Sequence, residues 1–347
     1  MYESQKTFEE WNLKSFYCSN KIVTDADTHE WCSFSHDGEY FSVISNSDTI
    51  NIFRCDGCSL LYQRQNKKYK STICEFHKEN NHLMYINSQG ASLSAKLLDV
   101  HEYSFVRYFP SKAQSNQQYI TLLKPMNRGL ITSHSDGSIH LWDDNAEDKI
   151  GELIVEPYPS FDIHPSGICL AVTTSKYLRI YDLRNTESAV AKIRLVNIGG
   201  ELKTYFGPIG NKLMILGKGI FQQFNTYNMS LNFSSDGIDT DSLGLGFEQH
   251  PAFAYTQDEN FFLLSNKDSK ILAFDSSFEH RPYRSRVNQS LRSLLTYSNL
   301  ISVYSGHNSS INRICFSPKY QNFVSTGNEC LFWSVDQNSL TSFKNKH

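Results

Sequence analysis

The feature of this sequence that most limits its fold is a pattern that recurs seven times along the chain. Each copy has an apolar stretch, a turn, a second apolar stretch, another turn, and a third stretch with an aromatic residue. The pattern is clearest in SHSDGSIHLWD, Ser133 to Asp143, where Asp136-Gly137 predicts a turn. Successive copies begin 42, 46, 41, 43, 50 and 60 residues apart. They begin at Cys32, Cys74, Ile120, Phe161, Thr204, Ala254 and Ile314.

Each copy predicts three β-strands joined by tight turns, because turn residues such as Asp37-Gly38 and Ser166-Gly167 separate the apolar stretches. A weaker fourth strand follows several copies, for example SLLYQRQ and GELIVE. Four short strands at a period of about 40–45 residues are typical of a propeller blade. The sequence therefore predicts an all-β, seven-bladed β-propeller, whose closed ring protects the sheet edges.

The whole chain, 1–347, is interpreted as one propeller domain. We expect its blades near 28–65, 66–110, 114–156, 157–197, 199–234, 247–306 and 307–337. An N-terminal strand near 13–24 is expected to supply the outer strand of blade seven. Residues 276–300 interrupt blade six with an arginine-rich insertion, which we interpret either as a solvated loop or as an arm for an acidic or phosphorylated segment.

Composition limits the function classes. The net charge is −3 with a sequence pI near 6.5, so we expect no direct nucleic-acid binding. The first twenty residues lack the apolar core of a signal peptide, and no apolar run approaches the roughly 18 residues of a membrane span. We therefore expect a soluble protein that is neither secreted nor membrane-bound. Its eight scattered cysteines are expected to be reduced.

Several segments resemble one particular family. They are KKYKSTICEFH (67–77), VRYFP (106–110), LITSHSDGSIHLWD (130–143) and INRICFSPKYQNFVS near the end. From about residue 13 to 336, the chain resembles the WD40-repeat subunit shared by two nuclear assemblies. One is the COMPASS-type histone H3 lysine methyltransferase complex. The other is the type-1 phosphatase module of the mRNA cleavage and polyadenylation machinery.

The resemblance implies a nuclear, non-enzymatic scaffold that is a monomeric subunit of a hetero-complex. Its partner would be either the methyltransferase catalytic chain or the phosphatase targeting subunit, and the residues do not choose between them. WD40 blades often join a His, a Ser or Thr, an Asp and a Trp in one hydrogen-bond network. The resemblance assigns such roles to Thr132, Asp136 and Trp142 in blade three and to His307, Ser325 and Trp333 in blade seven. Most other blades lack these residues.

A propeller presents rigid loops around a channel, which suits the binding of extended peptides. Residues that lead into the first strand of each blade ring one end of that channel. Those we consider candidate peptide anchors are His29, Trp31, Tyr69, Tyr119, Tyr158, Tyr205, Phe253 and Asn312. Packing between blades is the alternative role for them. Arg281, Arg284 and Arg286 of the insertion are further candidate contacts.

Enzymatic chemistry has little support in the sequence. The single C-x-x-C, Cys55 to Cys58, lacks a second Cys/His pair and fits a turn. No histidine pair has metal-ligand spacing, and no phosphate loop, dinucleotide fingerprint or nucleophile elbow is present. We therefore expect no catalytic residues, metal or cofactor. Two alternatives stay open: a cytoplasmic adaptor of trafficking or ubiquitin ligation, and a propeller hydrolase with a metal cluster in the channel.

Overall fold

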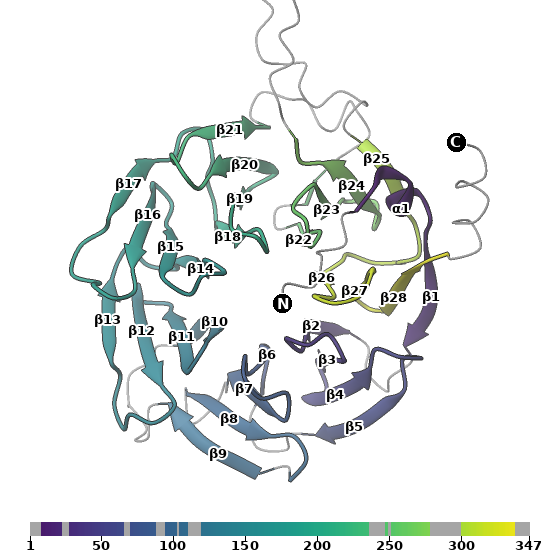
Figure 1. Cartoon of the computed structure of the whole chain (residues 1–347), viewed down its shortest axis with the longest axis horizontal. Coiled ribbons are helices and arrows are strands. Elements are labelled where there is room, and N and C mark those ends of the chain that lie inside the picture. Colours follow the sequence, from purple (N-terminus) through teal and green to yellow (C-terminus); the bar gives the residue numbers. More distant parts are fainter. Residues whose placement is uncertain are drawn as a thin grey trace, which may run out of the picture.

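The computed structural model describes residues 8–22, 28–65, 70–87, 94–102, 104–109, 119–235, 247–248, 251–277 and 300–336. Strands in these ranges form seven antiparallel sheets of four strands each. The sheets stand around a central axis like propeller blades (Figure 1). The predicted all-β, seven-bladed propeller is therefore confirmed. No helix among the described residues is long and apolar enough to cross a membrane.

In blades one to six the strands follow chain order from the channel outward (Figure 1). Blade one contains β2 (His29–Phe34), β3 (Tyr40–Ser45), β4 (Thr49–Arg54) and β5 (Leu60–Gln65). Blade two contains β6 (Cys74–Phe76), β7 (Leu83–Asn87), β8 (Ala95–Asp99) and β9 (Ser104–Phe109). Blade three contains β10 (Ile120–Met126), β11 (Gly129–His134), β12 (Ser138–Asp143) and β13 (Gly151–Ile154). Blade four contains β14 (Ser160–Ile163), β15 (Cys169–Thr173), β16 (Tyr177–Asp182) and β17 (Ala191–Arg194).

Blades five to seven complete the ring. Blade five contains β18 (Lys203–Phe206), β19 (Lys212–Gly217), β20 (Ile220–Asn225) and β21 (Leu231–Ser234). Blade six contains β22 (Phe253–Tyr255), β23 (Phe261–Ser265), β24 (Ile271–Asp275) and β25 (Leu300–Tyr304). Blade seven contains β26 (Arg313–Phe316), β27 (Asn322–Thr326), β28 (Cys330–Val335) and, as its outer strand, β1 (Phe16–Ile22), which the short helix α1 (Glu10–Lys14) precedes. Most of the arginine-rich insertion, residues 278–299, lies outside the described residues.

The turns explain why the strands end where they do. Gly137 closes the β11–β12 turn with φ of +98°, a conformation that L side chains rarely adopt. A Cβ atom at this position would lie 2.3 Å from the carbonyl oxygen of Val155. The Asp136-Gly137 turn of the best repeat is therefore fixed both by backbone conformation and by a close neighbour.

The hydrophobic core is divided into layers between neighbouring blades. Met214 of blade five and Phe262 of blade six share one cluster, and Leu178 of blade four packs with Ile215 of blade five in another. Each blade therefore buries both faces of its sheet, which explains the nearly continuous apolar runs of the middle strands. A blade has no complete core of its own, so its stability depends on the closed ring.

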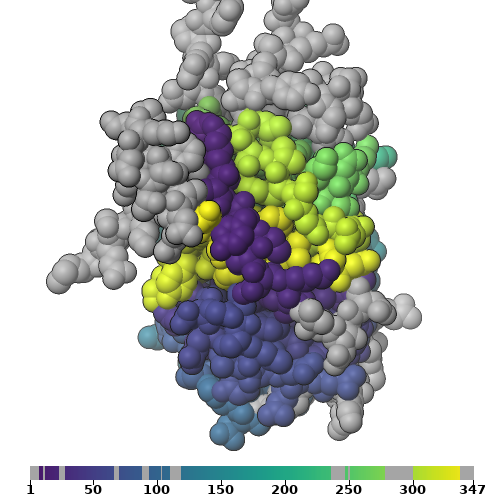
Figure 2. Space-filling model, turned by 90° about the vertical axis from the view of Figure 1, so that its right-hand side faces the viewer, coloured from purple at the N-terminus to yellow at the C-terminus, as the bar shows by residue number. Residues whose placement is uncertain are grey.

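The N-terminal segment closes the ring. Strand β1 pairs with β28 in antiparallel register, from Phe16 opposite Val335 to Ile22 opposite Cys330. The hydroxyl of Tyr304 in blade six donates a 2.6 Å hydrogen bond to the carbonyl of Leu13. Figure 2 shows the N-terminal segment (purple) lying against the C-terminal blade (yellow). Two segments that are more than 300 residues apart thus share one sheet.

Two buried networks stiffen blades three and seven. In blade seven the Ser325 hydroxyl lies 2.6 Å from His307 Nε2 and accepts a 2.8 Å hydrogen bond from the Trp333 indole. In blade three the Trp142 indole donates to Thr132 Oγ1 at 3.0 Å. That hydroxyl lies 3.1 Å from His134 Nε2. The histidine of the blade-three network is therefore His134, which lies on β11. The sequence analysis did not assign this role to His134.

The sequence analysis expected Asp136 to belong to the blade-three network, and the structure gives it other contacts. Asp136 accepts hydrogen bonds from the backbone N–H and hydroxyl of Ser138, so it organises the turn rather than contacting Thr132 or Trp142. In blade seven, where Asn328 and Glu329 stand near the position of the Asp, His307 Nδ1 is buried without a hydrogen-bond partner among the described residues. Each network therefore contains a His, a Ser or Thr, and a Trp, and lacks the Asp carboxylate that would be its fourth member.

Candidate binding site at the channel mouth

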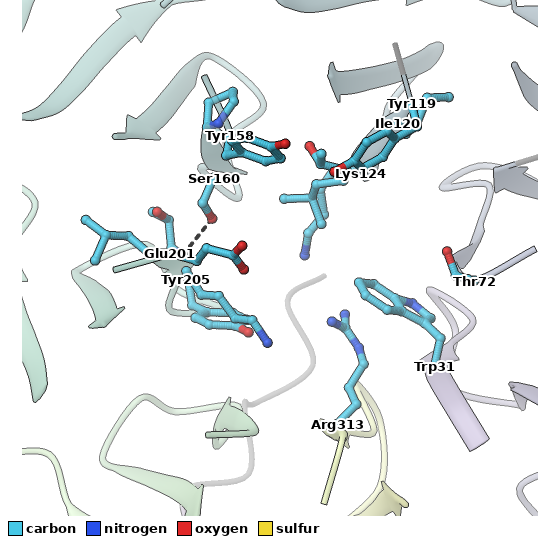
Figure 3. A pocket seen from close by; sticks show the side chains of 16 residues that line it. Trp31, Thr72, Tyr119, Ile120, Lys124, Tyr158, Ser160, Glu201, Tyr205 and Arg313 are labelled. Atoms are coloured by element: carbon cyan, nitrogen blue, oxygen red, sulfur yellow. Dashed lines mark hydrogen bonds between the residues drawn. The ribbon is translucent and has the colours of Figure 1, made fainter. Parts of the chain in front are cut away.

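A pocket of about 380 Å³ opens where the innermost strands of the ring begin. Four aromatic side chains from four blades line it, and Figure 3 shows them around one space together with Lys124 and Arg313. They are Trp31, Tyr119, Tyr158 and Tyr205. Four of the eight predicted channel residues therefore lie together at one site.

On one side of the pocket, an arginine lies against the tryptophan. The Arg313 guanidinium carbon is 3.5 Å from the centre of the Trp31 ring. Glu75, at the start of blade two, accepts hydrogen bonds from the Trp31 indole at 3.2 Å and from Arg313 at 3.3 Å. Burial raises the pKa of Glu75, whereas the nearby cations oppose that shift. The three side chains join blades one, two and seven at the channel.

A second ion pair joins blades three and four. Lys124 Nζ lies 3.4 Å from Asp162 Oδ1, and the other oxygen of Asp162 accepts a 2.8 Å hydrogen bond from the backbone N–H of Phe206. Burial tends to lower the pKa of Lys124, but Asp162 and Glu75 outweigh it and hold the pKa above the usual value. Lys124 therefore stays charged, and Lys124 and Arg313 are each matched by a carboxylate.

One thiol near this wall has unusual chemistry. A hydrogen bond with Cys32, aided by Arg313, lowers the pKa of Cys315 to about 7, although burial opposes the shift. Cys315 also donates to the Cys32 carbonyl at 3.0 Å. Glu75, Lys124, Asp162, Arg313 and Cys315 were not predicted as site residues. For the four charged residues, the signal that would have found them is a single charge within a largely apolar innermost strand, namely β6, β10, β14 and β26.

Two exposed tyrosines form the rim of the pocket. Tyr119 is 40% exposed and Tyr158 is 53% exposed. A hydrogen bond between their side chains raises the pKa of Tyr119, so its phenol stays neutral. Tyr158 also has φ of +56°, in the left-handed region that residues with a Cβ rarely occupy. Strained backbone of this kind is concentrated at binding sites, where it positions a side chain.

The strain at Tyr158 gives a testable prediction. Tyr158→Ala and Tyr158→Gly both remove the ring, but only alanine keeps the left-handed penalty. We expect the glycine variant to be more stable than the alanine variant by about 1 kcal/mol, despite the greater flexibility of glycine in the unfolded chain. Urea denaturation of the two proteins measures this difference. A more stable alanine variant would show that the backbone at this position is relaxed.

The remaining predicted anchors do not line the pocket. His29 is buried and its Nδ1 lies 3.2 Å from the carbonyl of Gly327 in blade seven. Phe253 is buried against the Tyr205 ring, and the exposed Asn312 donates a 2.9 Å hydrogen bond to the carbonyl of His29. These three residues connect neighbouring blades. Tyr69, Arg281, Arg284 and Arg286 lie outside the described residues.

The chemistry of the described residues favours binding. Glu75 and Asp162 are both engaged by cations and hydrogen bonds, so neither is placed as a free general base. No group of three or more His, Cys, Asp or Glu side chains within the described ranges is arranged to hold a metal ion. What the pocket offers is aromatic surface, hydroxyl groups and a balanced set of charges, which are features of peptide recognition.

Comparisons with known proteins agree with the fold. Residues 298–338, which include most of blade seven, match the WD40 family, described as "WD domain, G-beta repeat". WD repeat-containing protein 82 of Drosophila melanogaster is 23% identical over 175 residues, 50% of this chain and 54% of that protein. COMPASS component SWD2 of Saccharomyces cerevisiae is 23% identical over 335 residues, 94% of this chain and 95% of that protein. The match thus spans about half of the fly protein and nearly all of the yeast protein.

Proposed function

We propose that this divergent WD40 propeller is a non-enzymatic scaffold subunit that binds an extended segment of a larger protein at the channel mouth. The observation that carries the proposal is the convergence of four aromatic side chains from four blades on one pocket. Aromatic residues dominate the energetics of protein interfaces, because they bury a large area at a small cost in conformational entropy. Lys124 and Arg313 behind them are already paired with carboxylates, so a peptide can enter without leaving either charge unmatched.

The proposed setting is a nuclear transcription complex. The yeast relative that aligns with 94% of this chain is named as a COMPASS component. The sequence segments that resemble the shared subunit leave two complexes open, one for histone H3 lysine methylation and one for mRNA 3′-end processing with type-1 phosphatase. In either complex the chain would be a monomeric subunit that holds a protein partner and needs no cofactor. The alternative is a cytoplasmic WD40 adaptor.

Affinity purification from cells tests both the site and the setting. We expect the wild-type protein to recover methyltransferase or 3′-end-processing subunits. The variant Tyr119→Ser/Tyr158→Ser is expected to recover at least tenfold less, because two rim aromatics contribute about 2 kcal/mol or more in total. Tyr227→Ser is the matched control, since Tyr227 is 83% exposed but does not line the pocket.

Three results would contradict the proposal. Recovery of coat or ubiquitin-ligase subunits in place of nuclear proteins would favour the cytoplasmic adaptor. Full recovery of the same nuclear partners by the rim variant would place their binding surface elsewhere on the ring. Equal losses in the Tyr227 control would indicate that any exposed tyrosine affects the assay, and the pocket would lose its support.

A further inference from the structure

Strands β16 and β17 are the two outer strands of blade four and lie away from the channel (Figure 1). A group of cations lies on one face of this strand pair. Arg179 on β16 lies directly opposite Lys192 on β17, and Tyr177 lies opposite Arg194. Residues that are opposite in an antiparallel pair share a face of the sheet, and positions two apart along a strand share it too. We call Arg179, Lys192, Arg194 and Tyr177 the blade-four patch.

Two of these cations are held in place by neighbours. Glu156, in the loop before blade four, accepts two 2.6 Å hydrogen bonds from the Arg179 guanidinium. These bonds lower the pKa of Glu156 to about 2, so the pair stays ionised at neutral pH. Lys192 Nζ lies 4.2 Å from the centre of the Tyr177 ring. Arg179 and Lys192 are therefore positioned before any partner binds, which lowers the entropic cost of binding.

The charge of the patch is not balanced. Glu156 matches Arg179, whereas Lys192 and Arg194 are exposed and have no carboxylate partner among the described residues. Lys192 and Arg194 therefore leave two uncompensated positive charges on this face in the free protein, and a bound anion would offset them.

Protection of a sheet edge does not account for this arrangement. Lysine and arginine on an outer strand can prevent edge-to-edge aggregation. However, the outer strands β21 (LNFS) and β25 (LISVY) have no charged residue, so an outer strand of this ring does not need two cations for that purpose. The four residues of β17 include two cations and no acid. The outer strands β1, β5 and β9 have one cation each (Lys21, Arg64 and Arg107), so what distinguishes blade four is two cations on one outer strand without an acid.

We propose that the blade-four patch is a docking site for an acidic peptide segment, separate from the pocket at the channel mouth. Carboxylates of Glu or Asp would pair with Lys192 and Arg194, and the planar guanidinium of Arg194 suits a bidentate contact. Val190, two residues before Lys192, is 73% exposed and offers an aliphatic contact beside the cations. This combination favours a peptide with mixed acidic and aliphatic side chains over a nucleic acid, whose backbone presents phosphates and sugars and has no aliphatic side chain to pack on Val190.

The test uses the full-length protein and a fluorescein-labelled synthetic peptide of alternating Glu and Val residues, followed by fluorescence anisotropy. We expect the variant Lys192→Gln/Arg194→Gln to weaken binding about tenfold at low salt, because two exposed ion pairs are lost. A neutral peptide, with Gln in place of every Glu, is the second comparison. Its affinity for the wild-type protein should be as low as the affinity of the acidic peptide for the Lys192→Gln/Arg194→Gln variant. Binding should also weaken as salt is added.

The matched control removes the same number of positive charges elsewhere. Arg128 and Lys218 are exposed cations in turns of blades three and five, and Arg128→Gln/Lys218→Gln should bind the peptide as wild type does. Equal loss in both double variants, or none in the patch variant, would overturn the proposal. Tighter binding of a single-stranded oligonucleotide of equal charge, dependent on Lys192 and Arg194, would also overturn it. The rim variant Tyr119→Ser/Tyr158→Ser should bind this peptide normally, which separates this site from the proposed function.

Discussion

Replacement of Phe16 by alanine is expected to destabilise the protein by about 3–5 kcal/mol, the usual cost of deleting a buried phenylalanine ring. Phe16 begins the closing strand β1 and is 7% exposed. Its ring lies 5.1 Å from that of Phe323 and 6.1 Å from that of Tyr304, measured between ring centres. The loss would remove packing between blades six and seven where the two ends of the chain meet.

The next residue provides the control. Tyr17 is on the same strand but is 50% exposed, since alternate residues of a strand point to opposite faces. Tyr17→Ala should change the free energy of unfolding by no more than about 0.5 kcal/mol. Urea denaturation followed by tryptophan fluorescence measures both variants. Equal effects at the two positions would mean that β1 contributes through backbone pairing alone, contrary to our interpretation.

Acidification is expected to destabilise the protein through two buried histidines. Burial lowers the pKa of His134 to about 4 and that of His307 to about 4, whereas an exposed histidine titrates near 6.5. As pH falls through 6.5, the unfolded chain binds protons at these residues before the folded chain does. Each histidine therefore contributes stability that is fully present above pH 6.5 and is lost progressively between about 6.5 and 4.

The expected loss is about 3 kcal/mol for each histidine once the pH is below 4, from the linkage between protonation and folding. The variant His134→Gln/His307→Gln removes the titration while keeping an oxygen that can accept the Thr132 and Ser325 hydroxyls. We expect urea midpoints of the variant to fall less steeply between pH 7 and pH 4.5 than those of wild type. If the urea midpoint of the variant fell with pH as steeply as that of wild type, groups other than these two histidines would cause the acid sensitivity. The control is His36→Gln, because His36 lies in an exposed turn.

Much of the fold could be predicted because its signals are local. Within SHSDGSIHLWD, alternation predicts two strands and Asp136-Gly137 predicts the turn between them, where the structure has β11 and β12 joined at a glycine with positive φ. A strand or a tight turn depends on residues that are near in sequence. The repeat of this unit then indicated seven blades, because a single blade cannot bury both of its faces.

The candidate site was predicted only in part. Trp31, Tyr119, Tyr158 and Tyr205, chosen for their position before or within an innermost strand, line the pocket, and their role as peptide anchors stays a prediction. His29 and Phe253 had the same kind of position but pack between blades. Which side of a strand faces the channel depends on register and on small irregularities, such as the shift between His29 and Trp31. A repeat pattern alone does not specify these details.

The sequence by itself determined the number of blades, the turns and the class of fold, since these follow from short-range periodicity. Only the tertiary structure decided the charge pairing. Glu75 and Arg313 are 238 residues apart and meet because the ring closes. The unbalanced cations of the blade-four patch likewise depend on the register between β16 and β17. Electrostatic pairs are set by distance in space, and no local pattern encodes which distant strands the closed ring brings together.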